Sequence, residues 1–149
     1  MCLISFQWQP NAERTLILTA NRDEFFQRPT QQLHQWQDKP GVIAGKDLSQ
    51  GGTWLGIHTN GRFAALTNHR DLREESKKKV PADPISRGNL VIDFLTSNLA
   101  PLDYLTQLEK TAQQYDGYNL IVADSHTLAY FSNRSGQAPI ALPAGLYGL

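Results

Sequence analysis

Alternating apolar and polar residues at the start of the chain predict a β-hairpin. Residues 2–8 alternate with a period of two, as a half-buried strand does. The apolar face of this predicted strand consists of Cys2, Ile4, Phe6 and Trp8. A turn at residues 10–13 and a second run rich in branched residues at 15–22 complete an antiparallel hairpin.

A long polar segment separates this hairpin from the next strands. Residues 25–40 are rich in Gln and interrupted by Pro29, with Trp36 as a large apolar anchor, and they predict an irregular loop. The strand pattern then resumes at residues 42–45, 53–58 and 62–68. An Asn60-Gly61 pair between the last two runs is a strong hairpin signal.

Two amphipathic helices are predicted in the second half. Asp83-Pro84 offers an N-cap followed by proline at the first helical position. The apolar residues that follow at helical spacing are Val91, Phe94, Leu95 and Leu99. Pro101 begins a second helix that extends to about Tyr115, and its apolar stripe consists of Leu102, Leu105, Leu108 and Ala112. The run from Lys77 to Lys79 before these helices predicts a solvated loop.

The order of these elements predicts the fold class. Strands follow the helices at residues 118–123 and 128–132, and residues 146–149 have the pattern of another apolar strand. Strands, then two helices, then strands again favour an α+β fold with antiparallel sheets over alternating βαβ units. We predict one domain over residues 1–149 and, because the chain stops within an apolar strand, a C-terminally truncated part of a longer chain.

Composition excludes several classes of protein. Lys plus Arg and Asp plus Glu number 14 each among 149 residues, so no net charge attracts nucleic acid or anionic lipid. The apolar stretches are shorter than the ~18 residues of a membrane span. A single cysteine excludes an internal disulfide, and the four histidines lack the spacing of a zinc site. We therefore predict a cytoplasmic protein without metal or cofactor.

Cys2 is the first candidate for chemistry. Aminopeptidases generally remove Met1 before a residue this small, which would leave a thiol and a free α-amine on one residue. The amine titrates near neutral pH and can take the proton of the thiol, so the pair would form a nucleophile with its own base. The alternative is that Cys2 is a small buried residue of an apolar strand face. Spacing alone does not decide between them.

Other polar residues have two interpretations each. The hairpin brings Arg22 and Asp23 beside the N-terminus, where the guanidinium would favour the thiolate and the carboxylate would hold the α-amine. Alternatively, they belong to a solvated turn with a weak ion pair. Asn68 would donate to a developing oxyanion, or form a turn. The arginines that would pair with an anionic substrate, or merely serve solubility, are Arg62, Arg70 and Arg87.

An ordered series of short motifs runs along the chain. It begins with Met1-Cys2 and Asn21-Arg22-Asp23-Glu24, and continues with residues 25–29, 44–48, 51–56, 61–62, 66–70, 86–88, 118–120 and 145–149. On these motifs the chain resembles the NRDE family, also called the transport and Golgi organisation protein 2 family. That family is similar to the N-terminal nucleophile (Ntn) hydrolases, whose cysteine members, the penicillin V acylases and bile salt hydrolases, cleave non-peptide amides.

The resemblance implies a fold and a site. The expected fold is an Ntn-hydrolase-like αββα sandwich of antiparallel sheets, incomplete at the C-terminus. The expected catalytic residues are Cys2 as the nucleophile, Asp23 as the carboxylate near the α-amine, Asn68 at the oxyanion hole and Arg22 beside them. We further predict that Asn21, Trp54 and Arg62 bind the substrate.

Two functions remain open at this point. The first is an N-terminal-cysteine amidohydrolase that acts on a small-molecule amide or acyl substrate. The second is a non-catalytic binding or trafficking protein for a haem or lipid ligand, although the chain has no Cys-x-x-Cys-His motif. Fold analogy does not choose between them, because function resides in the site.

Overall fold

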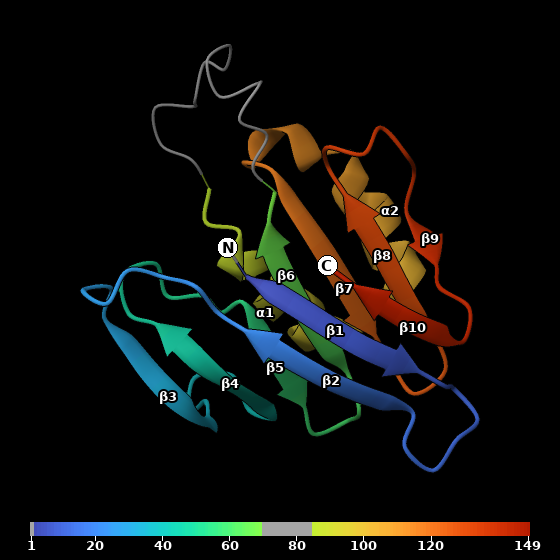
Figure 1. Cartoon of the computed structure of the whole chain (residues 1–149). Helices are drawn as coiled ribbons and strands as arrows, with labels where there is room; N and C mark the ends of the chain where they lie inside the picture. Colours follow the sequence, from blue (N-terminus) through green and yellow to red (C-terminus); the bar gives the residue numbers. More distant parts are fainter. Residues whose placement is uncertain (1, 70–84) are drawn as a thin grey trace.

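The computed structural model describes residues 2–69 and 85–149, and within these residues it has ten strands in two antiparallel sheets. Two α-helices, α1 (Gly88–Thr96) and α2 (Pro101–Glu109), lie between β6 and β7 in the sequence, followed by a short 3-10 helix, η1 (Ala112–Gln114). The α+β class with antiparallel sheets is therefore confirmed (Figure 1).

The larger sheet has seven strands in the order β3-β4-β5-β6-β7-β8-β9. These strands are β3 (Thr30–Gln35), β4 (Val42–Asp47), β5 (Leu55–His58), β6 (Phe63–Asn68), β7 (Tyr118–Ala123), β8 (Leu128–Ser132) and β9 (Ile140–Ala141). The smaller sheet has the order β10-β1-β2, formed by β1 (Leu3–Trp8), β2 (Leu16–Asn21) and β10 (Gly145–Gly148).

The larger sheet is covered on both faces. Helices α1 and α2 contact one face, and the smaller sheet packs on the other (Figure 1). Strand β6 shows the consequence, because Ala64 and Leu66 join the core beneath the helices while Phe63 and Ala65 join the core between the sheets. A strand buried on both faces is apolar on both rather than alternating, which explains the unbroken apolar run from Phe63 to Leu66 in β6.

Helices, larger sheet and smaller sheet correspond to three layers of the expected αββα sandwich, and the complete four-layer sandwich stays a prediction. The outward face of the smaller sheet carries exposed apolar side chains from all three of its strands. These side chains are Leu3, Ile17 and Leu146.

The predicted N-terminal hairpin is confirmed. Strands β1 and β2 pair antiparallel from Leu3 opposite Asn21 to Trp8 opposite Leu16. The inward side chains of β1 are buried in the core between the sheets, as the alternation predicted.

The prediction of an irregular loop over residues 25–40 was wrong, because the segment contains β3. This strand is at the edge of the larger sheet and pairs with β4. Most of its side chains are exposed, so it needs no apolar alternation, and backbone pairing with β4 outweighs its weak local signal. Trp36 is buried, as an anchor should be, and its indole donates to the Ala44 carbonyl.

The helices are confirmed with different boundaries. Helix α1 begins at Gly88, with Arg87 at its N-cap, and it ends before Leu99. Helix α2 begins at Pro101 as predicted, but its last turn gives way to η1 before Tyr115. The Asp83-Pro84 start signal and the lysine run at residues 77–79 lie outside the described residues.

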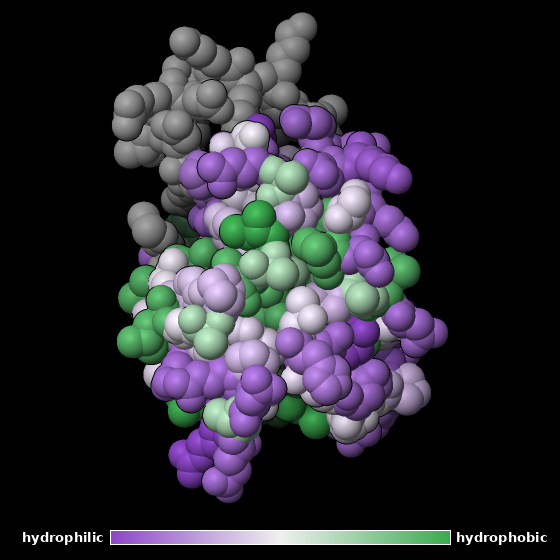
Figure 2. Space-filling view, turned by 90° about the vertical axis from the view of Figure 1, so that its right-hand side faces the viewer, coloured by the Kyte–Doolittle hydropathy of each residue, from purple (hydrophilic) through white to green (hydrophobic). Residues whose placement is uncertain are grey.

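The side of the molecule formed by β8, β9, β10 and α2 has apolar residues in its middle and polar residues around them (Figure 2). The exposed large apolar side chains of these elements are Leu102, Ile140 and Leu146. Among the described residues, no helix has the length and apolarity needed to cross a membrane.

Candidate active site

A cavity of about 370 Å³ lies where β1 begins, β6 ends and α1 begins. Its volume is within the range of small-molecule sites. Five residues singled out from the sequence line it together, although they come from distant parts of the chain. These residues are Cys2, Arg22, Trp54, Asn68 and Arg87.

The hairpin register explains why Cys2 and Arg22 line the same cavity. Leu3 is opposite Asn21, so the same register continued by one residue sets Cys2 opposite Arg22. Residues opposite each other in an antiparallel pair project from the same face of the sheet. Asn68 is the last residue of β6, where it is opposite Tyr118 of β7, and it also lines the cavity.

Cys2 differs from the other apolar residues of its strand. Ile4, Phe6 and Trp8 are buried in the core between the sheets, whereas Cys2 is half-buried, carries a free thiol and lines the cavity. The interpretation of Cys2 as a fully buried core residue therefore does not fit its position.

Three predicted site residues do not line the cavity. Asn21 and Asp23 are exposed and are not among the described residues that line the cavity. Arg62 is also outside the cavity, and only 8% of it is exposed. Its guanidinium donates to the carbonyls of Phe94 and Leu99 and to the hydroxyl of Ser97, at 3.2, 2.7 and 3.1 Å.

These contacts give Arg62 a structural explanation. Its guanidinium carbon lies 3.9 Å from the centre of the Phe94 ring, and its donors bind the Phe94 carbonyl in the last turn of α1 and the Leu99 carbonyl beyond the helix. Burial lowers the pKa of Arg62, partly offset by the charge of Asp124. The side chain holds the end of α1 to β6, so it does not contribute to the cavity.

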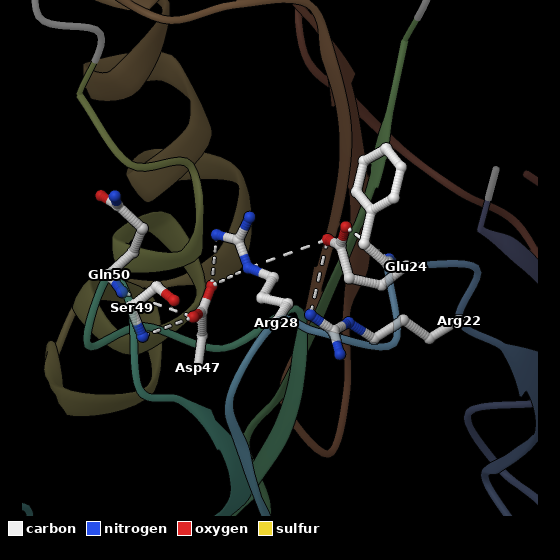
Figure 3. A network of polar contacts seen from close by, with 7 residues as sticks. Arg22, Glu24, Arg28, Asp47, Ser49 and Gln50 are labelled. Atoms are coloured by element: carbon white, nitrogen blue, oxygen red, sulfur yellow. Dashed lines mark hydrogen bonds and ion pairs between the residues drawn. The ribbon is translucent and has the colours of Figure 1, made fainter.

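A network of ion pairs that the sequence analysis did not identify forms one wall of the cavity (Figure 3). Arg28 donates to Asp47 from Nε at 2.9 Å and from Nη2 at 2.6 Å, both to Oδ2. Glu24 Oε2 lies 3.8 Å from Arg28 Nε and 3.5 Å from Arg22 Nη2. The network connects the loop after β2 to the end of β4.

Asp47 is the best satisfied carboxylate of this network. Its Oδ1 accepts the backbone N–H groups of Ser49 and Gln50 at 2.9 and 3.3 Å. Burial alone would raise the pKa of Asp47, but the hydrogen bonds from Arg28 and from these backbone groups outweigh it and lower that pKa. Reciprocally, the hydrogen bond to Asp47 raises the pKa of Arg28 despite burial.

A second wall depends on Asn133, which the sequence analysis also missed. Its Nδ2 donates to the carbonyls of Ala112, Tyr115 and Asp116, and its Oδ1 accepts the N–H of Tyr118 at 2.9 Å. One amide thus fixes the turn that carries Asp116, which lines the cavity. No local sequence signal identifies this role, since the acceptors lie 17 to 21 residues away.

Gly117, the residue after Asp116, connects this wall to the end of β6 and the start of α1. Its carbonyl accepts the N–H of His69 and the Nη1 of Arg87, both at 2.9 Å. Within residues 2–69 and 85–149, no group of three or more His, Cys, Asp or Glu side chains is placed to hold a metal ion.

Comparison with known proteins identifies relatives of the chain. The family model Transport and Golgi organisation 2 matches residues 1–149. The mouse Transport and Golgi organization 2 homolog is 41% identical over 100% of this chain, and the human homolog is 40% identical. The Transport and Golgi organization protein 2 of Drosophila melanogaster is 34% identical over 81% of it.

The match covers only part of these relatives. It includes 56% of the mouse and human proteins and 45% of the Drosophila protein, so the chain spans about half the length of these relatives.

Proposed function

The chain belongs to the Transport and Golgi organisation 2 family, and we propose that it is an N-terminal-cysteine amidohydrolase acting on a small non-peptide amide. The observation that carries this proposal is the shared cavity of Cys2, Arg22 and Asn68. A half-buried thiol that shares a cavity of small-molecule size with an amide donor has the components of acyl transfer.

The proposed reaction begins with removal of Met1, which gives Cys2 a free α-amine. This amine takes the thiol proton while the sulfur attacks the carbonyl carbon of the amide. The side-chain amide of Asn68 donates to the oxyanion that forms. The α-amine then delivers the proton to the leaving nitrogen, the C–N bond breaks, and the acyl group remains on Cys2 as a thioester.

Water completes the proposed cycle by attacking the thioester, which releases a carboxylic acid and restores the thiol. The carboxylate of Asp23 would hold the α-amine, and no cofactor takes part. In this proposal the protein works in the cytoplasm.

A second function is favoured by the names of the relatives, which refer to transport and Golgi organization rather than to hydrolysis. In this alternative, the same cavity holds a haem or lipid ligand without turnover. The two functions make different demands on Cys2, since only hydrolysis requires it as a nucleophile.

The experiment that separates them uses the full-length protein. Mass spectrometry should find Met1 removed, and a panel of amides and thioesters should show turnover that Cys2→Ala abolishes. Asn68→Ala should lower kcat by about 10²–10³-fold. The matched control is Asn98→Ala, because Asn98 is exposed between the two helices.

Two outcomes would contradict the hydrolase. One is a retained Met1; the other is turnover that is equal in the wild type and Cys2→Ala. A Soret shift on haem titration, without turnover of any amide, would support the binding function instead.

A further inference from the structure

We propose that Arg22 binds an anionic group of the substrate, and that the amide hydrolysed at Cys2 carries a carboxylate. The substrate class is then an N-acyl amino acid rather than a neutral amide. The hydrolysis step rests on the proposed function, whereas the anion site rests on charges and contacts around Arg22 and can be tested separately.

Most basic side chains of the cavity already have close partners. Among the described residues that line it, these side chains are Arg22, Arg28, Lys46 and Arg87. The guanidinium of Arg28 is held by two hydrogen bonds to Asp47. Lys46 Nζ lies 3.2 and 3.4 Å from the two carboxylate oxygens of Asp38 and 4.3 Å from the centre of the Trp36 ring. Arg87 donates to the Gly117 carbonyl.

Arg22 is held more loosely than these. Its contact with Glu24 is 3.5 Å long, well beyond the ~2.7–2.9 Å of a charge-assisted hydrogen bond. About a quarter of its side chain is exposed, and part of it faces the cavity. A guanidinium has five N–H donors in a planar fork, which matches the two oxygens of a carboxylate.

Glu24 can give up Arg22 at little cost. Its Oε1 accepts the N–H of Phe25 at 3.0 Å, and its Oε2 lies 3.8 Å from Arg28 Nε. When Arg22 turns to a ligand, Glu24 therefore keeps one hydrogen bond and a nearby positive charge. An ion pair as long as 3.5 Å contributes little to stability, so a ligand carboxylate competes with Glu24 on favourable terms.

The guanidinium of Arg22 and the sulfur of Cys2 belong to the same end of the hairpin. The paired strands end with Leu3 opposite Asn21, so Cys2 and Arg22 follow at the same end of the hairpin, and both line the cavity. An anion on Arg22 would therefore lie within one small molecule of the sulfur. Trp54, Leu66 and Ile85 supply apolar surface elsewhere in the cavity. An N-acyl amino acid fits both parts, with its carboxylate on Arg22 and its acyl group against the apolar side chains.

The anion site can be tested without any hydrolysis. Iodoacetate and iodoacetamide both alkylate a thiolate, forming the S–C bond and releasing iodide, but only iodoacetate carries a carboxylate. The ratio of their rate constants at Cys2, followed by peptide mass spectrometry, cancels differences in thiolate content. We expect this ratio to be about fivefold higher in the folded protein than in the same protein unfolded in urea.

Substitutions test whether Arg22 causes the higher ratio of the two alkylation rate constants. Arg22→Gln should return the ratio to within about twofold of the unfolded value, and Arg22→Lys should retain most of the increase. Glu24→Gln should raise the ratio further, because it removes the competing anion. The control is Arg14→Gln, which makes the same change of net charge on the exposed turn between β1 and β2 and should leave the ratio unchanged.

An unchanged ratio in Arg22→Gln, or an equal fall in Arg14→Gln, would overturn the anion site. Each variant is checked by circular dichroism and urea unfolding, and Arg22→Lys decides the matter if Arg22→Gln does not fold.

The substrate class is tested with matched pairs of an N-acylglycine and its N-acylglycinamide. The wild type should hydrolyse the acid at least about fivefold faster, and Arg22→Gln should lose that preference. Cys2-dependent hydrolysis without this preference overturns the substrate class and leaves the hydrolase standing. The expected alkylation ratios without hydrolysis of either compound support the anion site and count against the hydrolase.

Discussion

Gly52 and Gly88 lie against each other at the edge of the cavity, where the turn before β5 meets the first residue of α1. A Cβ atom added to Gly52 would lie 2.6 Å from the carbonyl carbon of Gly88 and 2.9 Å from its Cα. Backbone atoms of a helix cannot yield as a flexible side chain does. This contact explains why position 52 is glycine, and a Cβ on Gly88 would be more mildly crowded, 3.1 Å from the Thr53 nitrogen.

Gly52→Ala should therefore destabilise the protein by about 1–3 kcal/mol, because the turn must move away from α1. Urea unfolding measures this change. The control is Gly148→Ala, since a Cβ at Gly148 meets no atom within 4 Å and should change the free energy of unfolding by less than about 0.5 kcal/mol. Equal effects of the two substitutions would contradict the close contact.

Asp47→Asn should lower the free energy of unfolding at pH 7 by about 1–3 kcal/mol, because it weakens the pairing with Arg28. The pKa of Asp47 is lowered in the folded protein, so its ionised form adds stability above the ordinary value near 3.9, and this stability is lost as the pH falls through the folded value. The difference between wild type and variant should thus be constant from about pH 5 to 7 and shrink below about pH 4.

Urea unfolding at several pH values tests this prediction, since carboxylates common to both proteins cancel in the difference. A difference that grows as the pH falls would contradict it. Glu13→Gln, in the exposed turn after β1, controls for the loss of one negative charge at pH 7.

Arg62→Met should destabilise the protein by about 2–4 kcal/mol, since it removes the guanidinium that donates to the carbonyls of Phe94 and Leu99 and to the Ser97 hydroxyl. The rate at which iodoacetamide labels Cys2 in the folded variant should stay within about twofold of the wild type, because Arg62 is outside the cavity. Arg14→Met, at an exposed position, is the matched control for stability. A large change in labelling without loss of stability would restore Arg62 as a site residue.

Asn133→Ala should cost about 2–4 kcal/mol, because it removes the shared donor of three carbonyls and the acceptor of the Tyr118 N–H. Amide hydrogen exchange should show faster exchange at Tyr118, whose N–H loses its acceptor. Asn98→Ala should have neither effect, and an effect of similar size there would show that the loss is not specific to the hydrogen bonds of Asn133.

Local sequence patterns predicted the strands and helices that keep one buried face along their whole length. The β1–β2 hairpin alternates because one face of it is buried and the other is exposed, and its register brings Cys2 and Arg22 to the same end of the hairpin. Strand β3 escaped prediction because an edge strand with few buried side chains has no alternation to detect. The sequence predicted that α1 starts after Asp83-Pro84, but the helix starts at Gly88. No side chain caps this start, and the turn at Gly52 packs against it, so no local signal marked the position.

The amino-acid sequence by itself determined the α+β class, the hairpin that carries Cys2 and the membership in a family, because these depend on periodicity and on motifs that are continuous in the chain. Only the tertiary structure decided the partners of the charged groups. Arg28 meets Asp47 across 19 residues, and Arg62 reaches carbonyls 32 and 37 residues away. An arginine that binds substrate and an arginine that holds a helix have the same local sequence signal, and they differ only in what the folded chain brings to their guanidinium groups.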